Sequence, residues 1–370
     1  MSAPALAPPD LAVELDLDFD LDAIRALVAV HAPEVDRNDR PASWLLPDLA
    51  RRGLLRRGID GLLTDRRSSP DLTEVAQLID TIAQEDLATA FSVWAHRMVL
   101  DYLARADQSP TISTQLDDLL AGRRIGSTAM ASGVKALAGI DTLPVTAAFD
   151  DGVVTLDGTI PWASNLSADG IVVVSASRRY GAPVAIALPL DTPGITRREA
   201  RGLLSLEATS SGSLTLTGVR VGAEAVISDD LAAFVGDFRP GFLILQSSFA
   251  LGLARRALAE SEQLDGRPDQ NVLRPHPTTL TEVLERHTAT RDRLATAPAA
   301  ATSRELVTLR LEVVDLAIAA TRLEATLTGG RGFVAASPTS RRLREAAFLP
   351  IQSPSEGHLR WELSSLASTA

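Results

Sequence analysis

The sequence predicts an α+β chain of several domains: an N-terminal α-helical domain, a small middle β-barrel or sandwich, and a C-terminal α-helical bundle. Three observations predict it. The 370 residues exceed the length of one ordinary domain. The period of the apolar residues falls from about 3.6 to about 2 near residue 123. It returns to the helical value near residue 234, so we expect domains at 1–122, 123–233 and 234–370.

The N-terminal part carries helical spacing, and the middle part alternates. Apolar residues recur at steps of three and four in Leu21, Ile24, Leu27 and Val28, and the stretch 72–104 predicts one long helix or two. Strands are expected at 145–149 and 153–156, joined by an Asp-Gly turn, and at 171–175, 184–188 and 213–221. Turn residues at such regular spacing indicate a small barrel or sandwich.

The C-terminal part returns to helical spacing. Helices are expected at 242–263, 280–294 and 302–327, with a polar, proline-rich connector at 265–277. Glycines at 329, 330 and 332 are expected to end the third helix. The last segment, 339–370, is predicted to be helical around a break at Pro350 and Pro354.

Composition excludes several classes of site. The net charge of −11 argues against a nucleic-acid groove or an anionic membrane surface as partner. The chain has no cysteine, so disulfides, thiolate nucleophiles and cysteine-ligated metals are excluded, and the five histidines lack metal-binding spacing. We expect no metal site. Residues 1–10 lack the basic and apolar regions of a signal peptide, so a cytoplasmic location is expected. Lys135 is the only lysine among 36 basic residues, which indicates a GC-rich bacterial genome.

Five local stretches in the right order resemble the acyl-CoA dehydrogenase flavoproteins. They are Leu78–Ala88 followed by Thr89–Ser92, Phe149–Gly158 followed by Pro161–Asn165, Leu203–Val221, Phe249–Leu258, and the Gly-Gly-Arg-Gly-Phe turn at 329–333. Together they cover most of the chain. The resemblance implies that family's fold, a bound FAD, and a homodimer or homotetramer formed through the C-terminal helices.

The resemblance places the flavin against Trp162 and Ser164. An indole offers a rigid apolar face for an isoalloxazine ring, and a hydroxyl two residues along the strand can donate to a flavin nitrogen. The alternative is that Trp162 fills a core junction. Gly329 and Gly330 can approach a pyrophosphate closely, or they can simply cap a helix.

Two flavin signatures of the family are missing. The first flavin loop corresponds to Ala129–Lys135, which holds no acid, so Met130 and Ser132 are left to make backbone contacts. The motif that binds the neighbouring subunit's FAD is replaced by residues 265–269, where Arg267 is a poor substitute. A reduced or altered mode of FAD binding is therefore expected.

The family's catalytic base is also displaced. The position of its C-terminal glutamate falls on Ser353, and the alternative base position falls on apolar Phe242. Glu356 is the carboxylate nearest to the expected site, and it is the candidate base. The alternative is a helix N-terminal acid favoured by the helix dipole.

The ending Ile351–Glu356 also resembles flavin-dependent monooxygenases on the same fold. Gln352 stands where those enzymes have a histidine that serves the flavin's oxygen chemistry. His96 lies roughly where they carry another active-site histidine, and His358 is a further nearby imidazole.

Three functions therefore stay open. The first is α,β-desaturation of an acyl thioester, bound to CoA or a carrier protein, with Glu356 as base and FAD as electron acceptor. The second is a flavin-dependent monooxygenase acting on another small molecule. The third is a degenerate member that has lost flavin chemistry and serves as a binding subunit or catalyses a non-redox reaction. The acyl chain and the final electron acceptor are not fixed by the sequence.

Overall fold

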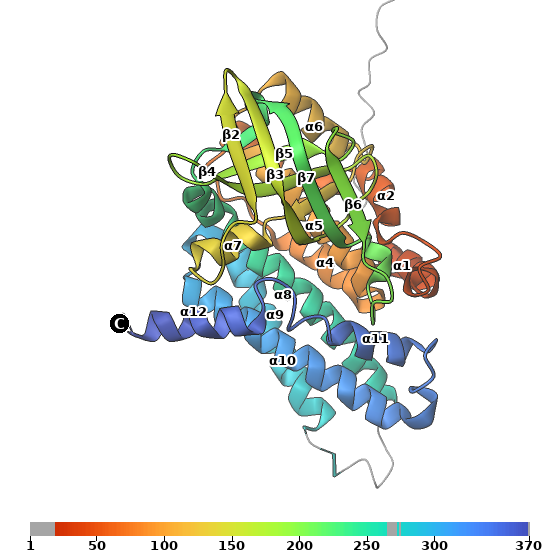
Figure 1. Cartoon of the computed structure of the whole chain (residues 1–370). Helices are drawn as coiled ribbons and strands as arrows, with labels where there is room; N and C mark the ends of the chain where they lie inside the picture. Colours follow the sequence, from red (N-terminus) through yellow and green to blue (C-terminus); the bar gives the residue numbers. More distant parts are fainter. Residues whose placement is uncertain (1–18, 265–271, 274, 369–370) are drawn as a thin grey trace, which may run out of the picture.

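The computed structural model describes residues 19–264, 272–273 and 275–368, and its element order confirms the predicted fold class (Figure 1). Residues 1–10 and Arg267, for which the sequence made predictions, lie outside the described residues. The N-terminal helices are α1 (Leu21–Asp36), α2 (Leu46–Arg51), α3 (Asp60–Thr64), α4 (Thr73–Glu85), α5 (Leu87–Arg105) and α6 (Pro110–Leu120). Short 3₁₀ turns are η1 (Ala42–Leu45), η2 (Leu54–Arg56), η3 (Glu207–Thr209), η4 (Ala223–Ala225), η5 (Pro298–Ala300) and η6 (Gly329–Arg331).

The predicted stretch 72–104 forms two helices, α4 and α5, because Asp86 interrupts it. Asp86 has extended backbone angles, and its side chain accepts a hydrogen bond of 2.7 Å from the backbone N–H of Thr89. This is the geometry of an N-cap, so the carboxylate ends one helix and begins the next. Every residue of α5 from Leu87 to Ala104 is buried, which makes α5 the central helix of this layer.

The middle of the chain forms a sheet folded into two layers, and in the view of Figure 1 the N-terminal helices lie behind it as a third layer. Its strands are β1 (Gly126–Ala129), β2 (Val145–Asp150), β3 (Val153–Ala163), β4 (Ile171–Arg178), β5 (Val184–Pro189), β6 (Ile195–Glu199), β7 (Gly212–Gly222) and β8 (Val226–Ser228), with helix α7 (Ala131–Leu137) after β1. Their order is β6-β7-β3-β2-β4-β5-β8, with β1 beside β4. The pairs β1–β4 and β2–β4 are parallel, and the others are antiparallel.

Strand β4 joins the two cores of the molecule. Val172 and Val174 point into the barrel core, whereas Ile171 and Val173 pack into the helical core. Successive side chains of a strand point to opposite faces, so a strand buried on both sides is apolar throughout. The run Ile171–Ser175 is therefore continuous rather than alternating.

The C-terminal helices are α8 (Leu231–Leu264), α9 (Pro277–Thr296), α10 (Ser303–Thr328), α11 (Pro338–Ala346) and α12 (Glu356–Ser368). The predicted start of α8 at Phe242 is wrong, because the helix continues through Pro240. α8 is long and apolar enough to cross a membrane, but 83% of its most apolar window is buried within the protein, so it is a core helix. Gly329, with φ of +66°, ends α10 and confirms the predicted helix end.

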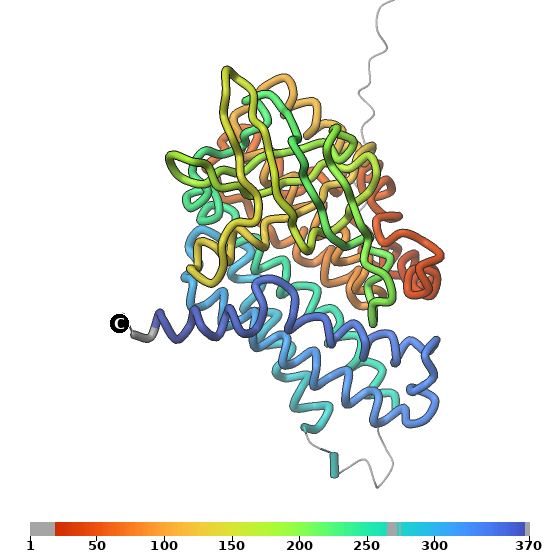
Figure 2. The backbone as a smooth tube through the Cα atoms, in the orientation of Figure 1, coloured from red at the N-terminus to blue at the C-terminus, as the bar shows by residue number. Residues whose placement is uncertain are grey.

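The last helix leaves the bundle and lies beside α7. The tube in Figure 2 shows the dark-blue C-terminal segment passing close to the yellow segment that follows β1. Lys135 of α7 contributes to lowering the pKa of His358 in α12, which requires the two side chains to be near each other. The two segments that the sequence singled out for a flavin and for the catalytic end of the chain therefore adjoin.

Candidate functional site

Trp162 is turned outward by an irregularity at the end of β3. The pairing of β3 with β7 shifts register between Ile160 and Ala163, both of which are buried. Pro161 and Trp162 both face outward between them, and the Trp162 side chain is 56% exposed. Such a bulge redirects a side chain and is common beside binding sites. The alternative that Trp162 fills a core junction is therefore wrong.

Asn165 fixes the segment that follows Trp162. Its side-chain N–H₂ donates to the carbonyl oxygens of Ser92 and Gly126, at 2.8 and 3.1 Å, and its side-chain oxygen accepts from Ser92 Oγ at 2.7 Å. The residue has φ of +55°, a conformation that asparagine tolerates better than most residues. All these groups are buried, so the end of β3 is held rigidly against α5 and β1.

Ser164 presents a free hydroxyl beside this anchor. Its backbone N–H donates to the carbonyl of Thr128 at 3.3 Å, and its carbonyl accepts from Ser127 Oγ. Within the part of the chain that the structure describes, no hydrogen bond joins Ser164 Oγ to another residue, and the residue is half-buried. It is thus available to a ligand that covers Trp162.

The first-loop candidates lie on the same side of the barrel. Met130 follows β1 directly and is buried, while Ser132 Oγ lies 3.3 Å from Ser175 Oγ. Gly133 packs so closely on β4 that an added Cβ would lie 2.8 Å from Ser175 Oγ. α7 contacts β3, so the structure brings Met130, Ser132, Trp162 and Ser164 to one end of the β-domain.

Comparison with known proteins decides the fold. No family model and no curated protein sequence matches the chain. Glutaryl-CoA dehydrogenase from Mycobacterium smegmatis in complex with FADH₂ matches with a TM-score of 0.75 and 20% identity, over 95% of each chain. Butyryl-CoA dehydrogenase from Megasphaera elsdenii matches with a TM-score of 0.74 and 17% identity, over 98% of this chain and all of that one. The chain has the acyl-CoA dehydrogenase fold.

A third solved structure with this fold has a different kind of ligand. KijD3 in complex with FMN and a dTDP-amino-keto sugar matches with a TM-score of 0.75 and 20% identity, over 95% of this chain and 93% of that one. At these identities the comparisons establish the acyl-CoA dehydrogenase fold and leave the reaction open.

His96 is bonded to the backbone through both ring nitrogens. Nδ1 accepts from the backbone N–H of Gly126 at 2.9 Å, so Nε2 carries the proton and donates to the carbonyl of Leu119 at 3.1 Å. Burial lowers the pKa of His96 to about 4, which keeps the ring neutral. His96 therefore ties α5 to the end of α6 and to β1, and its predicted catalytic role has no geometric support.

Glu356, the predicted base, is the first residue of α12. Its side chain is 40% exposed, and its carboxylate accepts from Arg360 Nε at 2.7 Å, one turn along the helix. Arg360 also lies 3.7 Å from Asp315 of α10. A catalytic base would be desolvated, whereas Glu356 is partly exposed and paired with Arg360. Both properties fit the alternative of a helix N-terminal acid. Its catalytic role stays a prediction.

Phe242, which stands at the family's alternative base position, is part of an aromatic cluster. Its ring lies 4.9 Å from that of Trp94 in an edge-on arrangement. Trp94 in turn stacks on Phe91 at 5.4 Å and meets Phe249 edge-on at 6.2 Å. These rings tie α5 to α8 through apolar contact, so no carboxylate enters the site from this position.

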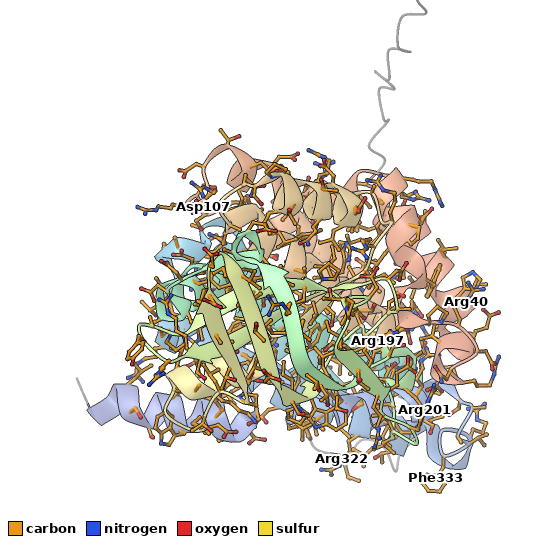
Figure 3. The ribbon with its side chains drawn as sticks, turned by 45° about the horizontal axis from the view of Figure 1, so that its top comes forward. Arg40, Asp107, Arg197, Arg201, Arg322 and Phe333 are labelled. Carbon is orange, nitrogen blue, oxygen red and sulfur yellow. The ribbon has the colours of Figure 1, made fainter. Side chains whose placement is uncertain are left out.

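Gly329 and Gly330 lie far from the other flavin candidates within one chain. Figure 1 places the connection from α10 to α11 at the opposite end of the C-terminal layer from α7. Phe333, the last residue of the glycine-rich turn, is 89% exposed and stands at the edge of the molecule (Figure 3). Within one chain, the glycine-rich turn and Trp162 therefore do not form a single site.

Proposed function

We propose that this protein is a flavin-dependent oxidoreductase whose flavin ring packs against Trp162. The proposal rests on the indole of Trp162. A bulge turns this side chain outward and leaves it 56% exposed, and the strand end that carries it is held rigidly. An exposed indole offers a rigid, flat apolar face on which a flavin ring can pack. The FADH₂ and FMN complexes among the solved structures with this fold support a flavin as the bound group.

The residues around Trp162 fit a flavin. The free Ser164 hydroxyl can donate to a ring nitrogen, and the backbone after β1 at Met130 and Ser132 borders the ring edge. Lys135 has no ion-pair partner within the described residues, and its ammonium group can hold a flavin phosphate. The bound flavin would supply the electron transfer, which no side chain here can perform. The protein orients the ring and excludes water on the Trp162 side.

Of the two redox reactions, monooxygenation fits these residues better than α,β-desaturation. Desaturation needs a base that removes an α-proton, but Glu356 is half-exposed and bound by Arg360. Monooxygenation with reduced flavin and molecular oxygen needs no such carboxylate. The substrate in this proposal is a small organic molecule, and an acyl thioester is the substrate of the competing proposal.

Flavin titration followed by two assays tests this function. Binding of FAD or FMN by the purified full chain should shift the flavin absorbance bands. Transfer of one oxygen atom from O₂ to a small organic substrate, dependent on reduced flavin from a separate reductase, supports monooxygenation. Anaerobic bleaching of the flavin by an acyl-CoA panel would instead establish desaturation. Absence of flavin binding at millimolar concentration would establish the degenerate function.

We also propose that two copies of the chain pair across a groove of about 770 Å³ between α9 and α10. Its apolar lining is Leu280, Val283, Leu309, Leu316 and Ala319. Arg304 lies at one end of the α10 wall, and Glu312 lies two turns further on. Two α10 helices crossing in antiparallel directions at Thr308 would place Arg304 of each copy opposite Glu312 of the other. This self-complementary charge pattern suits a two-fold axis.

A further inference from the structure

Arg310 is a buried cation without a buried anion. Five arginines are buried within the described residues, namely Arg97, Arg291, Arg310, Arg341 and Arg342. Four of them have a carboxylate oxygen within 4.0 Å: Arg97 has Asp101, Arg291 has Asp80, Arg341 has Glu345 and Arg342 has Glu324. Arg310, only 1% exposed, has none among the residues that the structure describes.

Only neutral acceptors surround the Arg310 guanidinium. Its Nε donates to Gln246 Oε1 at 3.2 Å, and its Nη2 donates to the Leu349 carbonyl at 3.1 Å and to Gln352 Oε1 at 3.0 Å. Burial lowers the pKa of Arg310 to about 10, and no acid offsets this. Arginines are almost never fully buried without a partner, because desolvating an unpaired charge is costly.

Unpartnered polar groups lie at the same place. The Gln352 side chain is 5% exposed, and its Nε2 has no hydrogen-bond partner. Ser353 Oγ, on the next residue, also has none, while the Ser353 carbonyl is held by Gln246 Nε2 at 2.9 Å. Because Gln352 Oε1 faces Arg310, its Nε2 points away from the guanidinium and offers an N–H donor. Buried donors of this kind normally have an acceptor.

This group of residues is within reach of solvent. Ile351, directly before Gln352, is 71% exposed, and Ser353, directly after it, is half-buried. A ligand therefore needs to pass only the loop between α11 and α12. This loop is held by Arg310 and Gln246, so the donors are already in place before a ligand arrives.

We propose that Gln352 and Ser353, backed by Arg310, receive the carboxylate group of a small-molecule ligand. One carboxylate brings the single negative charge that Arg310 lacks and accepts hydrogen bonds from Gln352 Nε2 and Ser353 Oγ. A phosphate dianion would leave one negative charge uncompensated in the same buried place. The test of this site needs no bound flavin, and the site adds a ligand class to the proposed oxidoreductase.

Thermal unfolding of the full, flavin-free chain tests this site. Acetate, butyrate and benzoate are exchanged for chloride at constant ionic strength, with phosphate as a separate arm. At ten times its dissociation constant, a bound carboxylate should raise the Tm of the wild type by about 2 °C. No rise with any carboxylate, or a rise with phosphate alone, overturns the proposal.

Gln352→Glu is the decisive variant. It keeps the shape of the side chain and supplies an internal carboxylate, so it should unfold at a higher temperature than the wild type and show no response to carboxylates. Arg310→Gln should also lose the response, and Gln352→Glu carries the test if that variant does not fold. Arg322→Gln, which removes an exposed cation from the same helix outside the groove lining, is the matched control and should respond like the wild type. An undiminished response in Gln352→Glu overturns the proposal.

Discussion

Glu345 of α11 accepts a hydrogen bond of 3.2 Å from the backbone N–H of Leu87, which brings its carboxyl group beside Asp86. Both acids are buried, and each has one oxygen without a partner. Arg341, 3.8 Å from Glu345, only partly compensates for their burial, and the ion pair of Arg344 with Asp36 lies nearby. Burial therefore raises the pKa of Glu345 to about 8 and also raises the pKa of Asp86.

This arrangement predicts that stability falls as the pH rises from about 5 to 8. In this range the folded chain holds a proton that the unfolded chain has released, so raising the pH favours unfolding. Glu345→Gln keeps a neutral, hydrogen-bonding side chain, and it should flatten the dependence and stabilise the protein at pH 8 by about 1–3 kcal/mol. Tm values of both proteins at pH 5.5 and 8 measure this. Parallel pH profiles would show that Glu345 does not carry the proton.

Trp162→Ala should weaken flavin binding by about tenfold or more while the protein still folds. The indole is exposed in the free protein, so its removal leaves no core cavity, but it removes the flat face on which the ring packs. Fluorescence titration with FMN gives the affinity. Tyr180→Ala, another exposed aromatic residue in the β-domain, is the matched control and should bind like the wild type. Equal losses in both variants would contradict the assignment.

Lys135→Gln should weaken the binding of FMN and leave that of riboflavin unchanged. Riboflavin has the same ring without the phosphate, so the difference isolates the contact of Lys135 with the phosphate. A single charge-assisted contact corresponds to a loss of about tenfold. The two dissociation constants at moderate salt measure it. A uniform loss for both ligands would assign Lys135 to the stability of α7 instead.

The layout of the fold could be predicted because it depends on the period of the apolar residues. The stretch 171–175 is read correctly as a strand, and the glycines after Thr328 end a helix as expected. The prediction began α8 at Phe242, whereas the helix continues through Pro240 with both flanking segments packed in the core, although a proline normally stops a helix. Tertiary packing overrode the local signal.

The candidate site could be predicted only where the local sequence determines the direction in which a side chain points. Trp162 was singled out by its motif, but its exposure depends on the register shift against β7, which lies some fifty residues away. Glu356 points to Arg360 because the two residues lie one turn apart at the start of α12, a local i,i+4 pattern that the sequence contained and the prediction did not use. Arg310 did carry a signal that went unused: it interrupts the apolar stripe of α10 between Leu306 and Val314.

Glu356→Gln should leave flavin binding and turnover unchanged if the proposed monooxygenation is correct. The carboxylate is bound by Arg360 at 2.7 Å, and it is a partly exposed helix N-terminal acid, so its loss should cost about 0.5 kcal/mol of stability or less. Anaerobic flavin reduction by acyl-CoA compounds and aerobic oxygen uptake are measured for both proteins. A loss of thioester-dependent flavin reduction by several orders of magnitude would restore Glu356 as the base.

Charge reversal should test the pairing of two copies through α10. Arg304 and Glu312 are eight residues apart, about 12 Å along the helix, and a two-fold axis near Thr308 brings each opposite the other in the second copy. Either Arg304→Glu or Glu312→Arg then creates two like-charge contacts per dimer, and each should raise the dimer dissociation constant about tenfold. The double variant Arg304→Glu/Glu312→Arg exchanges the charges and should restore wild-type affinity, because every contact again joins opposite signs. Sedimentation equilibrium measures the constants, with Glu282→Arg, on α9 outside the groove lining, as the control. A double variant as weak as the single ones, or a monomeric wild type, would exclude this interface.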